Sequence, residues 1–227
     1  MAHPVQPLPP ASLHGAAPPH FGEVRIRNRG RLPHWEKKAG LYFLTFHLAD
    51  SLPKKVLQKI AERQRILAAA KECGANLLPE QKVLLAEYNR RRMEEYFDRG
   101  CGLCALADSR VAGAMAAALR FWHGKRYRLL AWCVMPNHVH VVVKLLPGQE
   151  LGAVVKGWKL HVARSAKHAL GRPGRLWQRE YYDRLIRNRD ELNRAIQYIL
   201  ENPAKAGLKD WPWVWCSDTE TGHTADT

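Results

Sequence analysis

A β-branched run that carries two histidines constrains the fold of this chain more than any other feature. Residues 133–143 read Cys-Val-Met-Pro-Asn-His-Val-His-Val-Val-Val. Side chains alternate between the two faces of a strand, so His138 and His140 share one face. Val139, Val141 and Val143 then lie on the other. Two imidazoles on one face can both bind a single divalent metal ion. The run therefore predicts a strand with an apolar face and a candidate metal-binding face, although structural histidines fit the pair alone equally well.

The charge balance of the chain favours a polyanionic partner. The 227 residues include 36 Lys and Arg against 21 Asp and Glu, a net charge of +15. Phosphates that are neutralised by such a surface release counterions and draw the protein in. A merely basic surface is the alternative.

The sequence also indicates a cellular compartment. No run approaches the ~20 apolar residues of a membrane helix. The N-terminal residues are rich in proline where a signal peptide needs an apolar core. Five cysteines, an odd number, favour a reducing compartment over a disulfide framework. We therefore expect a cytoplasmic protein.

Three segments are expected along the chain. Residues 1–30 lack hydrophobic periodicity and predict a flexible, basic and Pro-rich N-terminal arm. Residues 31–215 are expected to form one domain, with a C-terminal tail at 216–227. A helical insertion over about 53–122 follows the first strand, with helices expected at 53–72, at 79–98 and from Asp108-Ser109 to about Trp122.

The remaining periodicities predict an α+β fold. Strands are expected at 41–48, 127–134, 138–144 and 180–186, and helices at 151–169 and 190–201, the last stopped by Asn202-Pro203. The short Met-Pro-Asn turn makes the second and third strands an antiparallel hairpin. This order favours one antiparallel sheet with helices packed on one face.

The last expected helix carries a second informative pair. Tyr198 and Asn202 are four residues apart and share a helix face. A phenol that attacks a phosphodiester forms a phosphotyrosine, and such an attack needs a metal ion to polarise the phosphoryl oxygens. The Asn202 carbonyl is a hard oxygen ligand suited to Mg²⁺ or Mn²⁺. A packing tyrosine and a helix C-cap are the alternatives for the two residues taken alone.

Several motifs together resemble one protein family. The run from Met135 to Val143 resembles the HUH signature (His, bulky hydrophobe, His) of single-tyrosine HUH transposases. Tyr-Ile-Leu-Glu-Asn-Pro-Ala-Lys-Ala-Gly-Leu, at 198–208, is similar to the nucleophile helix of their REP-associated branch, the RAYT proteins. Supporting matches are Tyr-Phe-Leu-Thr-Phe at 42–46, Leu-Trp-Gln-Arg-Glu-Tyr-Tyr-Asp-Arg-Leu-Ile-Arg at 176–187 and Trp-Pro-Trp at 211–213. The resemblance covers about residues 31–215, in the family's order.

The resemblance implies a fold, a reaction and a substrate. The implied fold is a ferredoxin-like sheet. His138, His140 and Asn202 would bind the divalent metal, Mg²⁺ or Mn²⁺. Tyr198 would attack single-stranded DNA and become linked to the 5′ phosphate, leaving a free 3′ hydroxyl. The implied partner is single-stranded DNA that carries a short imperfect hairpin, the REP palindrome, with a tetranucleotide beside it, bound by a monomer or a homodimer.

Basic residues outside these motifs are candidate DNA contacts. They are Arg25, Arg27, Arg29 and Arg31 in the arm, and Lys156, Lys159 and Arg164 on the helix after the hairpin. For each residue taken alone, a solvated charge is the favoured interpretation, but arginines at alternate positions are typical of arms that track nucleic acid. Trp158 and Trp177 either stack on bases or belong to the core.

Three rival functions use the same residues differently. A non-catalytic protein could bind structured nucleic acid through the basic surface, but all four candidate site residues are intact. An HUH nuclease of the replication-initiator or relaxase type often has a second tyrosine in the helix, and this helix has one. A metal-dependent hydrolase would need carboxylates near the histidines, and residues 130–145 contain none.

Overall fold

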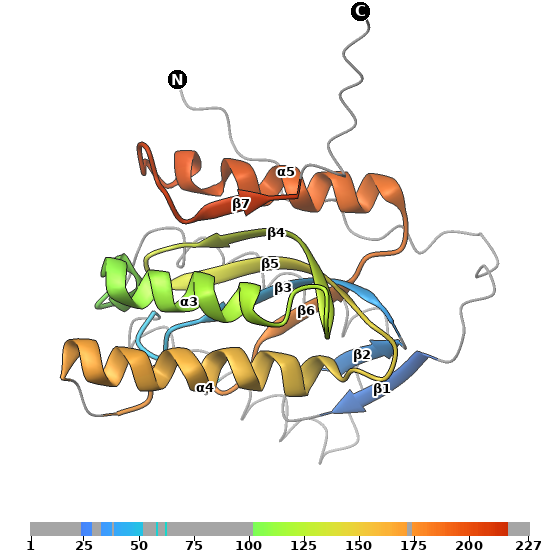
Figure 1. Cartoon of the computed structure of the whole chain (residues 1–227), viewed down its shortest axis with the longest axis horizontal. Coiled ribbons are helices and arrows are strands. Elements are labelled where there is room, and N and C mark those ends of the chain that lie inside the picture. The colour runs from blue at the N-terminus through green and yellow to red at the C-terminus, as the bar shows by residue number, and fades with distance from the viewer. Residues whose placement is uncertain are drawn as a thin grey trace, which may run out of the picture.

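A five-stranded antiparallel sheet forms the centre of the computed structural model, which describes residues 24–28, 33–37, 39–51, 58, 62, 102–171 and 174–217. Its strands lie in the order β6-β3-β5-β4-β7 (Figure 1). They are β3 (Leu41–His47), β4 (Tyr127–Val134), β5 (His138–Leu145), β6 (Tyr182–Leu185) and β7 (Val214–Cys216). Four of these strands confirm the expected ones to within a few residues, and β7 is additional.

The connections between these strands make the sheet ferredoxin-like. The chain runs β3-α3-β4-β5-α4-β6, with α3 at Ser109–Phe121 and α4 at Leu151–Leu170. This is the βαββαβ unit, and it confirms the expected α+β fold. The helix α3, which the sequence placed at the end of the insertion, is the first crossover helix of that unit. A short 3₁₀ helix, Ala105–Ala107, precedes it.

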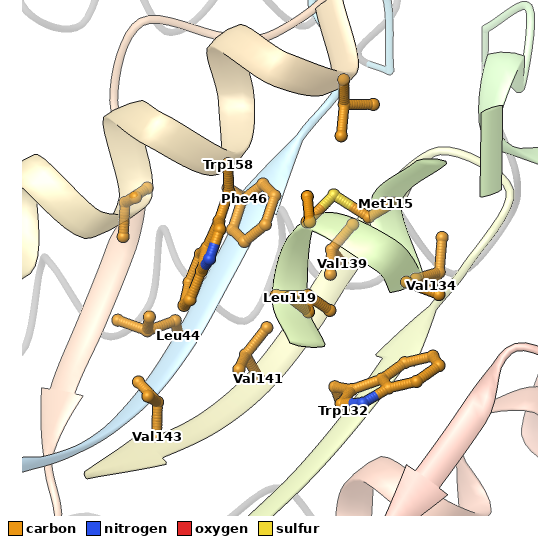
Figure 2. Close-up of a cluster of buried hydrophobic side chains, with 14 of the residues drawn as sticks. Leu44, Phe46, Met115, Leu119, Trp132, Val134, Val139, Val141, Val143 and Trp158 are labelled. Carbon is orange, nitrogen blue, oxygen red and sulfur yellow. The ribbon is translucent and has the colours of Figure 1, made fainter. Parts of the chain in front are cut away.

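Helices α3 and α4 cover one face of the sheet with the larger part of the core. Figure 2 shows Leu44, Phe46, Val139, Val141 and Val143 meeting Met115 and Leu119 from α3 and Trp158 from α4. Trp158 is 3% exposed, and its Nε1 donates to Tyr127 Oη at 2.8 Å. Trp177, 5% exposed, donates from Nε1 to the carbonyl of Lys159. Both tryptophans therefore belong to the core rather than to a base-stacking surface.

Helix α5 (Arg189–Lys205) packs on the opposite face, which differs from the expectation that the helices share one face (Figure 1). Its Leu192, Ile196 and Ile199 meet Phe43, Ala131, Cys133 and Val142. The physical reason lies in β4 and β5, where apolar residues alternate onto both faces. A sheet that is apolar on both faces must be covered on both.

The end of α5 also differs from the expectation. The helix passes through Asn202 and Pro203 and ends at Lys205. Pro203 removes one backbone donor but does not stop the helix, because Ala206 N donates to Asn202 O at 3.1 Å and Leu208 N donates to Pro203 O at 2.9 Å. Asn202 therefore stays on the helix, one turn beyond Tyr198.

The first strand of a hairpin lies within the segment expected to be an irregular arm, residues 1–30. β1 (Val24–Asn28) pairs antiparallel with β2 (Pro33–Lys37). Arg25 and Arg27 fall on β1, and Arg29 and Arg31 lie outside the described residues. The Val-Arg-Ile-Arg alternation has the period of a strand, a signal that the sequence analysis missed.

Other expectations fall mainly outside the described residues. Of the helix expected at 53–72, Gln58 and Glu62 are described, and both are helical. The helix expected at 79–98 and most of the arm and tail lie outside. In the described part of the chain, no helix has the length and apolar character needed to span a membrane.

Candidate catalytic site

The two histidines of β5 lie side by side on the face of the sheet that α5 covers. His138 is 1% exposed and His140 is 2% exposed. Their Nε2 atoms are 2.9 Å apart, and their ring centroids are 4.6 Å apart. The alternation of β5 therefore brings both imidazoles to one buried point, as the sequence predicted.

Neighbouring side chains constrain the roles of the ring nitrogens. Asn137 Oδ1 lies 2.7 Å from Nδ1 of His138, and this oxygen can only accept, so Nδ1 donates and Nε2 of His138 carries its lone pair. Thr45 Oγ1 lies 2.9 Å from Nδ1 of His140 and, as a hydroxyl, can either accept or donate. When Thr45 donates, Nε2 of His140 carries the proton and donates to Nε2 of His138 at 2.9 Å. When Thr45 accepts, both Nε2 atoms carry lone pairs, which is the arrangement that a shared metal ion requires.

Burial keeps both imidazoles neutral. It lowers the pKa of His138 to about 3. Burial, and then the proximity of His138, hold the pKa of His140 well below its ordinary value. Neutral imidazole is the form that binds metals. The electrostatics of the pair therefore suit a metal site at neutral pH.

Asn202 offers the site an oxygen ligand. Its side chain is 3% exposed, its Nδ2 lies 3.5 Å from Nε2 of His140, and its buried Oδ1 has no hydrogen-bond partner. A 180° rotation of the amide would exchange these two atoms and turn the oxygen toward the imidazoles. A buried carbonyl oxygen without a partner is costly, and a metal ion would satisfy it.

His138 and His140 need the Asn202 side-chain amide as a third ligand to make a metal site. Among the described residues, no three His, Cys, Asp or Glu side chains form a group that could hold a metal ion. Two imidazole nitrogens and an amide oxygen make a mixed ligand set. This set suits Mn²⁺ or Mg²⁺ when water molecules fill the remaining coordination positions.

Tyr198 lies directly against this cluster. Its ring centroid is 5.2 Å from that of His140 and 5.8 Å from that of Phe43, nearly perpendicular to both. Phe43 in turn stacks on His140 at 5.6 Å. The aromatic contacts orient the phenol beside the imidazoles, so the structure brings together the four residues that the sequence selected.

Strand β3 supplies site residues that sequence reasoning missed. Phe43 and Thr45 contact His140, and His47, which is paired in register with His138, has its ring centroid 5.5 Å from that of His138. Burial, followed by His138 and His140, holds the pKa of His47 well below its ordinary value. These three share one face by alternation, but their proximity to β5 follows from strand order, which the sequence does not show.

The candidate DNA contacts on α4 lie on the other face of the sheet from Tyr198. Lys156 and Arg164 are exposed. Lys159 is partly buried, and its Nζ donates to the carbonyls of Gln178 at 2.9 Å and Glu180 at 3.3 Å. Burial lowers its pKa to about 8. The structure therefore brings none of the three to the candidate site.

Comparison with known proteins finds similarity over the part of the chain that contains this arrangement. The model of the IS200-like transposases matches residues 113–202, a range that contains both histidines, Tyr198 and Asn202. A REP-associated tyrosine transposase of Escherichia coli K12 is 27% identical over 101 residues, which cover 43% of this chain and 59% of that protein. Over these ranges the chain is similar to IS200-like transposases and to a REP-associated tyrosine transposase.

A second curated relative matches a similar share of the chain. A putative REP-associated tyrosine transposase of Haemophilus influenzae is 27% identical over 101 residues, 38% of this chain and 57% of that protein. The match thus spans under two thirds of the length of either curated relative.

Two solved structures were also compared. One is a REP-associated tyrosine transposase bound to a REP hairpin, with a TM-score of 0.46 at 18% identity over 87% of this chain and 97% of that one. The other is a putative transposase from Deinococcus radiodurans, with a TM-score of 0.32 at 17% identity over 78% and 98%.

Proposed function

We propose that this protein cleaves and rejoins single-stranded DNA carrying a REP-type hairpin, through a covalent bond between Tyr198 and a 5′ phosphate. The observation that carries the proposal is the Tyr198 ring 5.2 Å from His140, whose Nε2 is 2.9 Å from that of His138. The names of the curated relatives and the net charge of +15 support a DNA substrate.

His138, His140 and Asn202 would hold the divalent metal ion, Mg²⁺ or Mn²⁺. When bound, the metal supplies Lewis-acid stabilisation of the charge on the phosphoryl oxygens. Thr45 and Asn137 orient the two imidazoles from behind through their Nδ1 atoms. Phe43 packs against both the His140 and Tyr198 rings and limits how far the phenol can turn.

The chemical step is a transesterification. Tyr198 Oη attacks phosphorus, an O–P bond forms, and the bond from phosphorus to the 3′ oxygen breaks. The phenol loses one proton and the departing 3′ hydroxyl gains one, so no water and no external energy source is consumed. The phosphotyrosine retains the bond energy, and attack by a 3′ hydroxyl can therefore rejoin the strand.

The test is to incubate the protein with labelled hairpin-bearing single-stranded DNA and Mn²⁺, and to look for a protein–DNA adduct that resists denaturation. The wild type should form it and Tyr198→Phe should not. His138→Ala should abolish the adduct while hairpin affinity is largely retained.

Other outcomes would contradict the proposal. An undiminished adduct in Tyr198→Phe would exclude Tyr198 as the nucleophile. Equal loss of cleavage and hairpin affinity in His138→Ala would show that the histidines serve structure. Binding by the wild type without any adduct would support the non-catalytic nucleic-acid-binding function instead.

A further inference from the structure

A lysine on the last turn of α5 lies against the candidate nucleophile. Lys205 Nζ is 5.6 Å from the centroid of the Tyr198 ring. The two residues are seven positions apart, which is about two helical turns, so they project from the same side of the helix. Helix α5 thus presents the phenol, the Asn202 amide and an ammonium group along one stretch of its surface.

A carboxylate holds this ammonium in place. Glu201 accepts from Lys205 Nζ at 2.7 Å, and the Gln197 side-chain amide also donates to the Glu201 carboxylate. Because both side chains are substantially exposed, at 33% and 42%, the ion pair adds little to stability.

The phosphate that Tyr198 attacks would be stabilised by a cation in addition to the metal ion that His138, His140 and Asn202 would hold. A phosphodiester carries a negative charge, and its non-bridging oxygens gain charge during the attack. Preorganised cations at such oxygens stabilise the transition state strongly. Lys205 lies where an ammonium group could reach a phosphate that is seated at the phenol.

We propose that Lys205 is a further catalytic residue, whose ammonium binds a non-bridging oxygen of the phosphate that Tyr198 attacks. Glu201 holds the ammonium beside the phenol until the phosphate displaces the carboxylate. Lys205 stays protonated throughout and makes no covalent bond, and the bond that forms and the bond that breaks are those of the transesterification. This inference rests on the proposed function.

The test measures the single-turnover rate of adduct formation with saturating hairpin DNA and Mn²⁺. Lys205→Met should lower the rate about 100-fold, as loss of one transition-state donor does, with DNA affinity nearly unchanged. Lys205→Arg should recover part of the rate. The matched control is Lys167→Met, which removes an exposed lysine from α4 on the other face of the sheet and should keep the wild-type rate.

Two further experiments distinguish a catalytic role of Lys205 from a structural one. If the ion pair only stabilised α5, Glu201→Gln and Lys205→Met would lose the same activity, whereas the proposal expects Glu201→Gln to keep most of it. With a neutral methylphosphonate at the scissile position, the ratio of wild-type to Lys205→Met rates should fall toward one, because the charged oxygen is gone.

Failure of the proposed role of Lys205 and failure of the proposed function would give different results. A wild type that forms the adduct together with a Lys205→Met variant within threefold of its rate would overturn the role of Lys205 alone. A wild type that forms no adduct would overturn the proposed function and, with it, this inference.

Discussion

His140 is the residue on which the contacts of the candidate site converge. Its Nδ1 meets Thr45, its Nε2 meets His138 and Asn202, and its ring packs against Phe43 and Tyr198. The partners come from β3, β5 and α5, so three elements fix the orientation of one imidazole. Substitutions in any of these elements should therefore change the orientation of the candidate metal ligands before they unfold the protein.

The Thr45 hydroxyl provides a residue-scale test of this view. Thr45→Val keeps the shape of the side chain but removes the partner of Nδ1 of His140. Loss of such a supporting hydrogen bond should lower Mn²⁺ affinity by about 10–100-fold, measured by titration of free Mn²⁺. Thr45→Ser, which keeps a hydroxyl, is the control. Equal Mn²⁺ affinity in all three proteins would show that Thr45 does not orient the ligand.

The buried imidazoles predict a pH dependence of metal-free stability. The pKa of His138 is lowered to about 3, so between about pH 6.5 and 3 the unfolded chain binds protons that the folded chain excludes. The free energy of unfolding should therefore be highest above about pH 6.5 and should fall as the pH decreases from there toward about 3. Denaturant titrations of a His138→Gln, His140→Gln variant should show a shallower fall. An identical slope in the variant would contradict the assignment.

The candidate site depends on helix α5, because this helix supplies Tyr198 and Asn202. Leu192, Ile196 and Ile199 anchor it to the sheet, while Tyr198, Asn202 and Lys205 project toward the candidate chemistry. The helix begins at Asn188, whose side-chain oxygen accepts from Glu191 N at 2.8 Å. An end without this cap would leave a backbone donor unsatisfied.

The cap gives a prediction at the scale of the element. Asn188→Ala should lower the free energy of unfolding by about 1 kcal/mol, measured by urea titration. Asn193→Ala, on an exposed position inside the same helix, should cause no such loss because alanine favours helix interiors. If both variants lose the same stability, the side chain of Asn188 does not act as a cap.

Elements with strong local patterns were predictable, and those that depend on packing were not. The bounds of β4 follow from its apolar run between turn signals, and the end of α4 follows from Gly171, which has a positive φ of 61°. β7 is three residues long and is defined by pairing with β4, so it has no pattern of its own. Pro203 signalled a stop, yet hydrogen bonds beyond it keep α5 continuous.

In the whole molecule, the sheet separates the face that packs against the larger core from the face that carries the candidate site. Helices α3 and α4 bury the larger core on one face (Figure 1), and on the other face Tyr198 and Asn202 of α5 contact His140. Residue type and alternation predicted His138, His140, Tyr198 and Asn202 as candidates. Their partners Thr45 and Phe43 could not be predicted, because they depend on β3 lying next to β5, across about ninety residues of chain.

The same division separates the basic candidates. Lys156 and Arg164 on α4 lie on the opposite face from Tyr198, and Lys159 is occupied by backbone carbonyls. A DNA segment that touched both α4 and Tyr198 would have to pass around an edge of the sheet. The cation that the structure places beside the phenol, Lys205, is on α5 itself.

The central claim is that Tyr198 becomes covalently linked to DNA, and mapping the linkage tests it most directly. Cleavage by trypsin after Arg194 and Lys205 releases the peptide Ala-Ile-Gln-Tyr-Ile-Leu-Glu-Asn-Pro-Ala-Lys, in which Tyr198 is the one hydroxyl-bearing side chain. After reaction with hairpin DNA and Mn²⁺ and digestion of the DNA, mass spectrometry should find this peptide carrying a nucleotide phosphate. A nucleotide on any other peptide, with this one unmodified, would contradict the claim.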